Sequence, residues 1–211
     1  MPNKVKRWLF KQFQDNFIIY FIITIIFAIG IIIGAITIKV LNSEQKKGII
    51  TFLNSFFKTM DGNSFENLSI FKQSIIDNFK TIGLIWLTGI IVIGLPIIPV
   101  TILFRGFALG FTVGFLVNEY GVQGFMFSIL GIMPQNLFII PGIISVSSIG
   151  MAFSINSIKN RKLRIRNNNL RLNIVNYSIL ILFFSAIILI GCLIEAYIAP
   201  IFLRLLSEHL K

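Results

Sequence analysis

The stretch FIIYFIITIIFAIGIIIGAITIKV, residues 17–40, decides the fold class, because Lys39 is its only charged side chain. A helix of roughly 20 apolar residues crosses a hydrocarbon layer about 30 Å thick. Residues 174–198 form a second block of this kind, with the single charge of Glu195 near its end. Only 13% of the 211 residues are charged, and the mean hydropathy is +0.87. The sequence therefore predicts an all-α, polytopic membrane protein with one membrane domain.

The distribution of the net charge of +11 predicts the orientation. Residues 1–15 and 159–171 are basic, whereas residues 42–79 balance lysines against acidic side chains. Cytoplasmic loops carry the excess of Lys and Arg, so the two basic segments are expected inside and 42–79 outside. Basic strips beside a membrane attract anionic lipid headgroups. We expect no nucleic-acid partner, because no aromatic residues interleave with the 159–171 charges.

An even number of spans must separate two cytoplasmic segments, and this condition predicts five spans in total. The expected spans cover about 16–39, 81–104, 105–120, a stretch that ends near 159, and 174–199. Pro96 and Pro99 are expected to break or kink the inner end of the second span. Residues 122–136 are expected to form a broken or re-entrant helix.

The outer segment 42–79 carries two apolar stripes at helical spacing, which predict two short amphipathic helices. The stripes are Ile49, Phe52, Leu53, Phe56 and Met60, then Leu68, Phe71, Ile75 and Phe79. The helices would lie on the outer membrane surface or pack on the ends of the spans. Three phenylalanines are candidates for a docking face: Phe52, Phe56 and Phe71.

The chain shows no pattern typical of an enzyme. Its single histidine, His209, has no Cys, Asp or second His at ligand spacing. Neither a phosphate-binding loop that ends in Lys-Ser or Lys-Thr nor a Gly-x-Ser-x-Gly elbow occurs. We therefore expect no catalytic activity, no metal and no cofactor.

Two glycine motifs at four-residue spacing predict close helix packing, since glycine lets two backbones approach in lipid. Gly30 and Gly34 lie in the first span, and Gly106, Gly110 and Gly114 in the third. Whether the partner helix belongs to this chain or to a second copy stays open. A homodimer is therefore one prediction of these motifs.

Two charges lie close to the predicted hydrocarbon. Arg105 is expected at the inner edge between the second and third spans, where its side chain can reach the headgroups. Glu195 is expected near the outer end of the last span, at a helix boundary or partner contact, or as a solvated carboxylate. By this topology the two lie on opposite sides of the membrane and do not pair directly.

Three blocks together resemble the stage II sporulation protein M family of endospore-forming Firmicutes. They are RGFALGFTVGFLV, MPQNLFIIPGII and LIEAYIAPIFLRLL, in this order, with a basic loop before the last span. The resemblance makes seven residues family-motif or partner-contact candidates: Arg105, Pro134, Gln135, Asn136, Pro141, Glu195 and Pro200. It implies a non-enzymatic scaffold in the mother-cell membrane at the sporulation septum. Its implied partners are stage II sporulation proteins D and P, with which it would thin the septal wall and drive engulfment.

A permease-like transport subunit is the alternative. Broken helices occur near transporter substrate sites, and Gln135 and Asn136 could supply polar ligands at such a break. Alternatively, their amides cap the freed backbone of the break itself. The wider family resembled here typically has Pro-His-Gly at this position, followed by Glu; this chain has Pro134-Gln135-Asn136 and Ile139. That departure weakens a transport function based on proton transfer.

Overall fold

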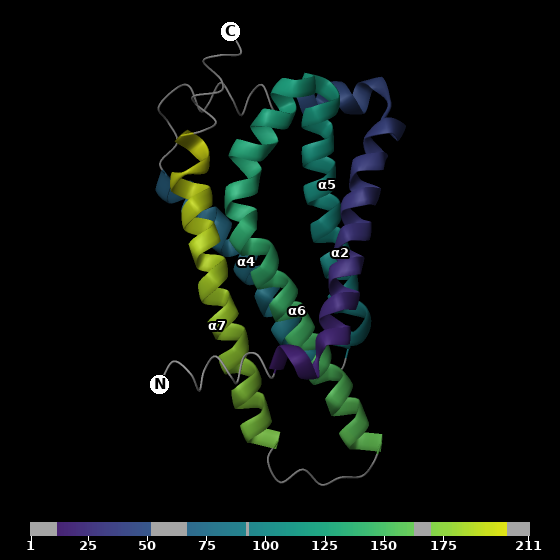
Figure 1. The fold of residues 1–211 in the computed structure, drawn as a ribbon, viewed down its shortest axis with the longest axis vertical. Helices are drawn as coiled ribbons and strands as arrows, with labels where there is room; N and C mark the ends of the chain where they lie inside the picture. The colour runs from purple at the N-terminus through teal and green to yellow at the C-terminus, as the bar shows by residue number, and fades with distance from the viewer. Residues whose placement is uncertain (1–11, 52–66, 92, 163–169, 202–211) are drawn as a thin grey trace.

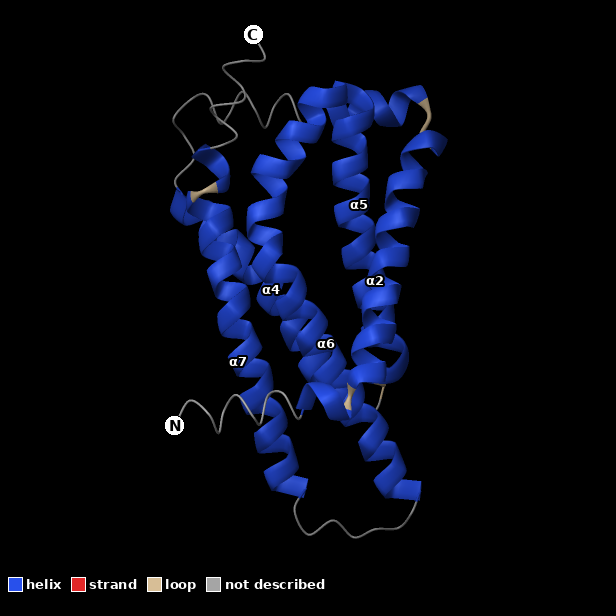
Figure 2. Ribbon diagram, in the orientation of Figure 1, coloured by secondary structure: helices blue, strands red, loops and turns tan. Residues whose placement is uncertain are grey.

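The protein is a bundle of long helices, seen here in a computed structural model that describes residues 12–51, 67–91, 93–162 and 170–201. These ranges contain helices and turns and no strand, which confirms the all-α prediction (Figure 2). The long helices are α2 (Phe17–Thr37), α4 (Asn67–Ile90), α5 (Gly94–Phe127), α6 (Met133–Lys162) and α7 (Leu170–Tyr197). In Figure 1, α2 begins at the same end of the bundle where α6 ends and α7 begins. This arrangement is the one expected from the charges, because the basic segments 1–15 and 159–171 are both predicted to be cytoplasmic.

Three described segments are long and apolar enough to cross a membrane: Phe17–Val40, Gly94–Lys159 and Asn173–Ile201. The second of these contains both α5 and α6, and the helical path is broken at Gly121. The protein is thus a membrane protein. Because α4 is not among the three segments, the count of five spans stays a prediction.

The predicted break near 122–136 is present. Gly121 has φ of 57°, a left-handed conformation that glycine adopts without steric cost. A π-helical turn, η2 (Ser128–Ile132), follows a few residues later. Residues 121–132 thereby link α5 to α6 at the upper end of the bundle in Figure 1.

The predicted second span, 81–104, is wrong in its bounds. α4 ends at Ile90, a turn follows, and α5 begins at Gly94. Pro96 is the third residue of α5, where the backbone N–H has no partner within the helix in any case. A proline in the first turn costs no helical hydrogen bond, so Pro96 suits the start of α5. Pro99 is the sixth residue and lies inside the helix, where it removes one backbone hydrogen bond. Both prolines lie near the start of one helix and not at the end of another.

The predicted loop 42–79 is also shorter than expected, because α4 begins at Asn67. A first helix is present over residues 43–51, and residue 51 is the last one described before the gap at 52–66. Its start is capped by Asn42 and Gln45, whose side chains accept hydrogen bonds from each other's backbone N–H at 3.1 and 2.8 Å. Lys46 of this helix pairs with Glu119 of α5 at 3.6 Å.

The surface of α4 differs from the predicted apolar stripe. Two members of the stripe, Leu68 and Phe79, are 50% and 41% exposed, whereas Phe71 and Ile75 pack against the core. Ser74 and Asn78 on the same helix are buried. An apolar stripe marks the buried face of a helix only where water surrounds the protein. In lipid, apolar side chains can face outward, and polar groups are satisfied inside the bundle. The prediction of two short surface helices is therefore wrong for 67–79, which is the first half of a 24-residue helix.

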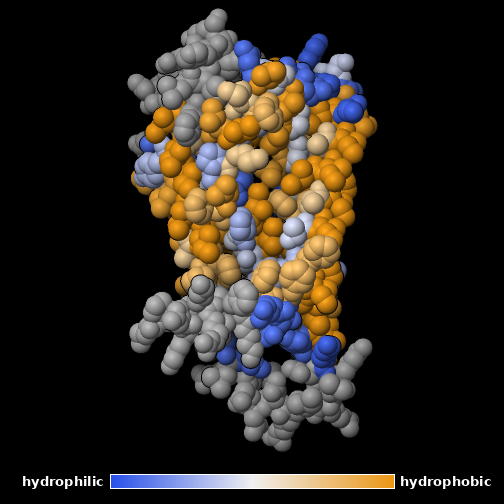
Figure 3. Space-filling model, in the orientation of Figure 1, coloured by the Kyte–Doolittle hydropathy of each residue, from blue (hydrophilic) through white to orange (hydrophobic). Residues whose placement is uncertain are grey.

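The outer surface of the bundle is largely apolar. Figure 3 shows a broad hydrophobic band with hydrophilic residues gathered towards both ends. On α2, Phe21, Ile25, Ile32 and Ile36 are all exposed. Side chains of this kind suit contact with lipid tails, so this face of α2 can remain on the outside of the bundle.

Helices α2 and α5 approach each other backbone to backbone at the two glycine motifs. A methyl group added at Gly30, Gly34, Gly106 or Gly110 would overlap a carbonyl oxygen of the facing helix. Those oxygens belong, in the same order, to Leu103, Phe107, Phe27 and Ile31. A methyl at Gly114 would meet the side chain of Ile38. The two motifs face each other within one chain, so they no longer argue for a homodimer.

We predict that Gly110→Ala destabilises the bundle by about 1–3 kcal/mol, because the added methyl must displace the backbone of α2. Gly83→Ala is the matched control, since nothing lies within 4 Å of its added methyl. The control is expected to be neutral or to gain up to about 1 kcal/mol. Thermal unfolding of the detergent-solubilised chain checks both; equal midpoints for the two variants would contradict the packing role.

Candidate functional site: a buried polar network

Arg105 lies inside the bundle and not at its edge. It is about 16 Å along the α5 axis from Gly94, at 1.5 Å per residue, and its side chain is half-buried. The prediction that Arg105 marks the cytoplasmic boundary is therefore wrong. It depended on the misplaced second span, whose end would have put residue 105 at the headgroups.

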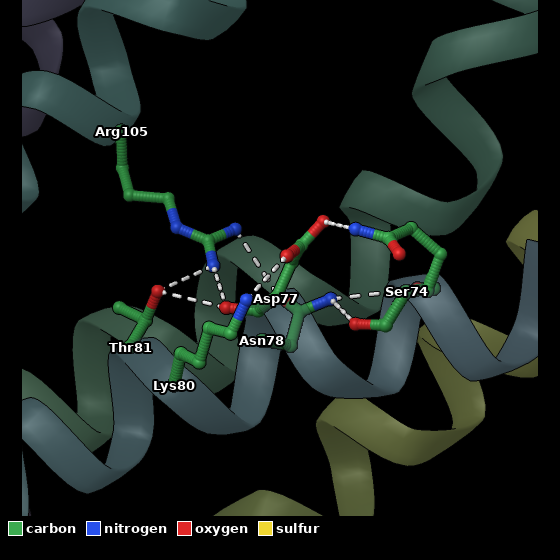
Figure 4. Close-up of polar contacts among 7 residues, drawn as sticks. Ser74, Asp77, Asn78, Lys80, Thr81 and Arg105 are labelled. Carbon is green, nitrogen blue, oxygen red and sulfur yellow. Dashed lines mark hydrogen bonds and ion pairs between the residues drawn. The ribbon is translucent and has the colours of Figure 1, made fainter.

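The guanidinium of Arg105 donates three hydrogen bonds to α4 (Figure 4). Its acceptors are Asn78 Oδ1 at 3.1 Å, the main-chain oxygen of Asp77 at 3.2 Å and Thr81 Oγ1 at 2.7 Å. All three acceptors are uncharged groups. Within the described ranges Arg105 forms no ion pair, so its charge is compensated through intermediaries.

Asn78 connects the hydrogen bonds of Arg105 to residues that contact α7. Its Nδ2 donates to the main-chain oxygen of Ser74 at 3.0 Å and lies 3.4 Å from Cys192 Sγ. Ser74 Oγ in turn donates to Glu195 Oε2 at 2.5 Å. Asn78 and Ser74 are 3% and 7% exposed. The network therefore runs from α5 through α4 to α7.

Arg105 and Glu195 form no direct pair, as predicted, but the prediction that they lie on opposite sides of the membrane is wrong. The structure places both charges in the network just described, bridged by an amide and a hydroxyl. A charge inside a membrane is costly unless it is paired or hydrogen-bonded. This bridged arrangement gives each charge polar partners and sets the positions of three helices relative to one another.

Sequence reasoning missed Ser74, Asn78 and Thr81, although a signal for them exists. They are spaced by four and three residues, so they share one face of a helix. The same segment therefore carries a polar stripe beside its apolar one. In a membrane helix the polar stripe is the better indicator of the buried face.

A second set of bonds joins α4 to α7 further down. Tyr177 OH donates to the main-chain oxygen of Trp86 at 3.2 Å, and Trp86 Nε1 donates to Ser178 Oγ at 3.1 Å. From Glu195 to Tyr177, α7 extends about 27 Å. The α4 residues that make these bonds, Ser74 and Trp86, are about 18 Å apart along their own helix, so α4 follows α7 over a little more than half the thickness of a hydrocarbon layer.

The family-motif candidates of α6 lie beside the π-helical turn. Asn136 Nδ2 donates to the main-chain oxygen of Ile132 at 2.8 Å, so this amide caps the backbone of its own break. Gln135 is buried, and its Oε1 has no hydrogen-bond partner among the described residues. Pro134 is half-buried and Pro141 exposed, both within α6. None of these side chains has a hydrogen bond that joins it to the polar network.

The remaining candidates are at the outer end of α7. Pro200 is buried, just beyond the end of that helix. Phe71 packs against the core, with its ring 6.5 Å from that of Tyr197. Phe71 thus contributes to the contact between α4 and α7, whereas Phe52 and Phe56 lie outside the described residues.

The described residues bring together no three His, Cys, Asp or Glu side chains that could hold a metal ion. The polar groups of the site bind one another across helices. Chemically, this arrangement can hold α4, α5 and α7 in a set register.

These features define an all-helical membrane protein whose buried polar groups join its helices. The family model described as Stage II sporulation protein M matches residues 23–200, and the chain belongs to this family. It is therefore a sporulation-associated membrane protein. The comparisons with curated proteins and with solved structures found no match.

We predict that Asn78→Leu destabilises the bundle by about 1–3 kcal/mol, because it removes one of the three acceptors of Arg105 and breaks the link between Arg105 and Ser74. The combined variant Asn78→Leu/Arg105→Met should lose less than the sum of its two single changes, since the groups act together. Thr112→Val is the control, because that exposed hydroxyl bonds only to Ala108 O of its own helix. Thermal unfolding in detergent measures all four variants; strict additivity would argue against a shared network.

Proposed function

We propose that the chain is a non-enzymatic scaffold of the sporulation septum that holds peptidoglycan-remodelling enzymes in the mother-cell membrane. The observation that supports this most is the use of Arg105 and Glu195. Both intramembrane charges take part in bonds between helices, as expected of a frame that presents a fixed surface. The family match supports the sporulation context.

In this proposal the outer segment docks the enzymes, whose action thins the septal wall during engulfment. The family resemblance suggests stage II sporulation proteins D and P as the partners. Phe52 and Phe56 are the docking candidates to test. Phe71 is unsuitable because its substitution would disturb the contact with α7.

We predict that Phe52→Asp/Phe56→Asp reduces recovery of proteins D and P at least tenfold in affinity purification of the tagged chain from detergent-extracted sporulating cells. The reason is that a carboxylate would replace each aromatic contact of the docking face. Ile29→Phe, a change at an exposed position of α2, is the control and should retain both partners. Undiminished recovery with the double variant would reject this docking face. Failure of the unaltered chain to recover either enzyme would reject the scaffold.

Transport remains the second candidate because Gln135 Oε1 is buried beside a π-helical turn and has no hydrogen-bond partner in the part of the chain that the structure describes. π-Helical turns occur frequently at functional sites. If this break conducts a solute, Gln135→Leu should abolish flux of a panel of radiolabelled small solutes into proteoliposomes. Asn136→Leu would serve as the structural comparison, since its amide caps the break. No flux above that of empty liposomes would reject transport of the solutes tested.

A further inference from the structure

An apolar face is exposed on the segment that links α5 to α6 at the upper end of the bundle in Figure 1. We define the cap face as four large apolar residues of this segment: Val122, Phe125, Met126 and Ile129. Their spacing places them on one side of a helix, and they are between 38% and 79% exposed. The other side is held against α5, because Gly124 is buried and a methyl group added there would overlap the main-chain oxygen of Leu116. The cap face therefore points away from α5.

The cap face begins beyond the edge of the hydrocarbon layer. A methyl group added at Gly114 of α5 would meet the side chain of Ile38, so these two residues are at the same depth. Ile38 is about 3 Å from Val40, which ends an apolar segment long enough to cross a membrane. α5 continues from Gly114 for about 10 Å before the break at Gly121. The break is therefore about 7 Å beyond the edge, at the depth of headgroups and water.

Headgroups and water do not satisfy an apolar surface. The ion pair of Lys46 with Glu119 lies just before the break, as expected of a polar environment at this depth. Contiguous apolar residues that are exposed in such an environment mark a contact surface. A protein segment with an apolar stripe of its own would cover the cap face.

The sequence after α7 contains such a stripe. Residues 202–211 lie outside the described residues, so the stripe is a property of their sequence alone. Its members recur at helical spacing and are Phe202, Leu205, Leu206 and Leu210. Polar residues fall on the other side: Arg204, Ser207, Glu208 and Lys211. In water this segment, like the cap face, would have apolar side chains to bury.

The residues that precede the 202–211 segment are packed against the bundle. α7 ends at Tyr197, a turn follows at Ile198, and residues 199–201 are helical again. Pro200 suits the first turn of this new helix, where a backbone N–H has no helical partner. Ala199 is 4% exposed, and Pro200 is also buried. The 202–211 segment therefore begins beside the protein and in a new helical direction.

The cap face is within reach of this starting point. Gly191 of α7 and Gln135 of α6 are at the same depth, because a methyl group added at Gly191 would be 3.0 Å from the main-chain oxygen of Gln135. The chain rises about 15 Å from Gly191 to Ile201, and up to about 14 Å from Gln135 back to Met126. Packed helices are about 8–10 Å apart, and residues 202–211 cover about 15 Å as a helix.

We infer that residues 202–211 dock on the cap face through their apolar stripe. The contact buries two apolar surfaces at one depth and leaves the polar side of the segment towards headgroups and water. The segment is attached a few residues from the contact, and such a tether gives it an effective concentration of roughly millimolar. A second copy or a separate enzyme has no such advantage. The inference does not rest on the proposed scaffold function.

Cysteine accessibility tests the docking with the full chain in lipid nanodiscs. Met126→Cys should react with a polar maleimide at least tenfold more slowly alone than together with Leu205→Asp/Leu206→Asp, because the two carboxylates release the segment. Lys47→Cys, at an exposed position of the helix 43–51, is the control and should react equally fast with and without the two aspartates. The chain without an added cysteine gives the background of the buried Cys192. Equal rates for Met126→Cys in both chains would overturn the proposal.

Disulfide formation then identifies what covers the face. Met126→Cys/Leu206→Cys should form a disulfide within one chain on oxidation. Met126→Cys/Ser207→Cys places the second cysteine on the polar side and should form at most a tenth as much. A chain shortened to end at residue 201 replaces the double aspartate variant if thermal unfolding shows that the latter does not fold. A disulfide between two chains would assign the face to a second copy, and slow reaction that persists without the segment would assign it to lipid; either result would overturn the proposal.

Discussion

A guanidinium group inside a lipid-embedded bundle must find its hydrogen-bond acceptors on neighbouring helices, because hydrocarbon offers none. Arg105 meets this requirement entirely through α4. The constraint explains why a helix too polar to count as a spanning segment still lies within the bundle. α4 is held by polar bonds near Ser74 and Asn78 and again near Trp86. Its place in the fold therefore depends on side-chain chemistry more than on hydropathy.

The sequence was sufficient to predict the features that depend on local composition. Long apolar runs indicated the helical membrane class, and the spacing of glycines such as Gly34 and Gly110 indicated where backbones could approach. The identity of the facing helix was not predictable, because each motif is compatible with several partners. Only the folded chain shows that the two motifs face each other, which also explains why both occur in one protein.

The predicted positions of Arg105 and Glu195 were wrong for one reason, which is the predicted end of the second span. Prolines usually end helices, so Pro96 and Pro99 predict the end of a span, although a proline in the first turn, such as Pro96, is equally compatible with a helix start. A span that ends at these prolines places Arg105 at the membrane edge, on the side opposite Glu195. The polar stripe of α4 would have corrected the error, since buried Asn78 needs a partner at the same depth.

The α2–α5 contact has a consequence for the order of biosynthesis. α2 is synthesised before α5, and its glycine groove is filled by residues made roughly 75 positions later, about 4–15 s at bacterial translation rates. During that interval the groove of α2 can only face lipid or the insertion machinery. Assembly of the bundle therefore cannot proceed strictly helix by helix. The α2–α5 contact forms only once Gly106 to Gly114 have been inserted, and α6 and α7 are added to the bundle after that step.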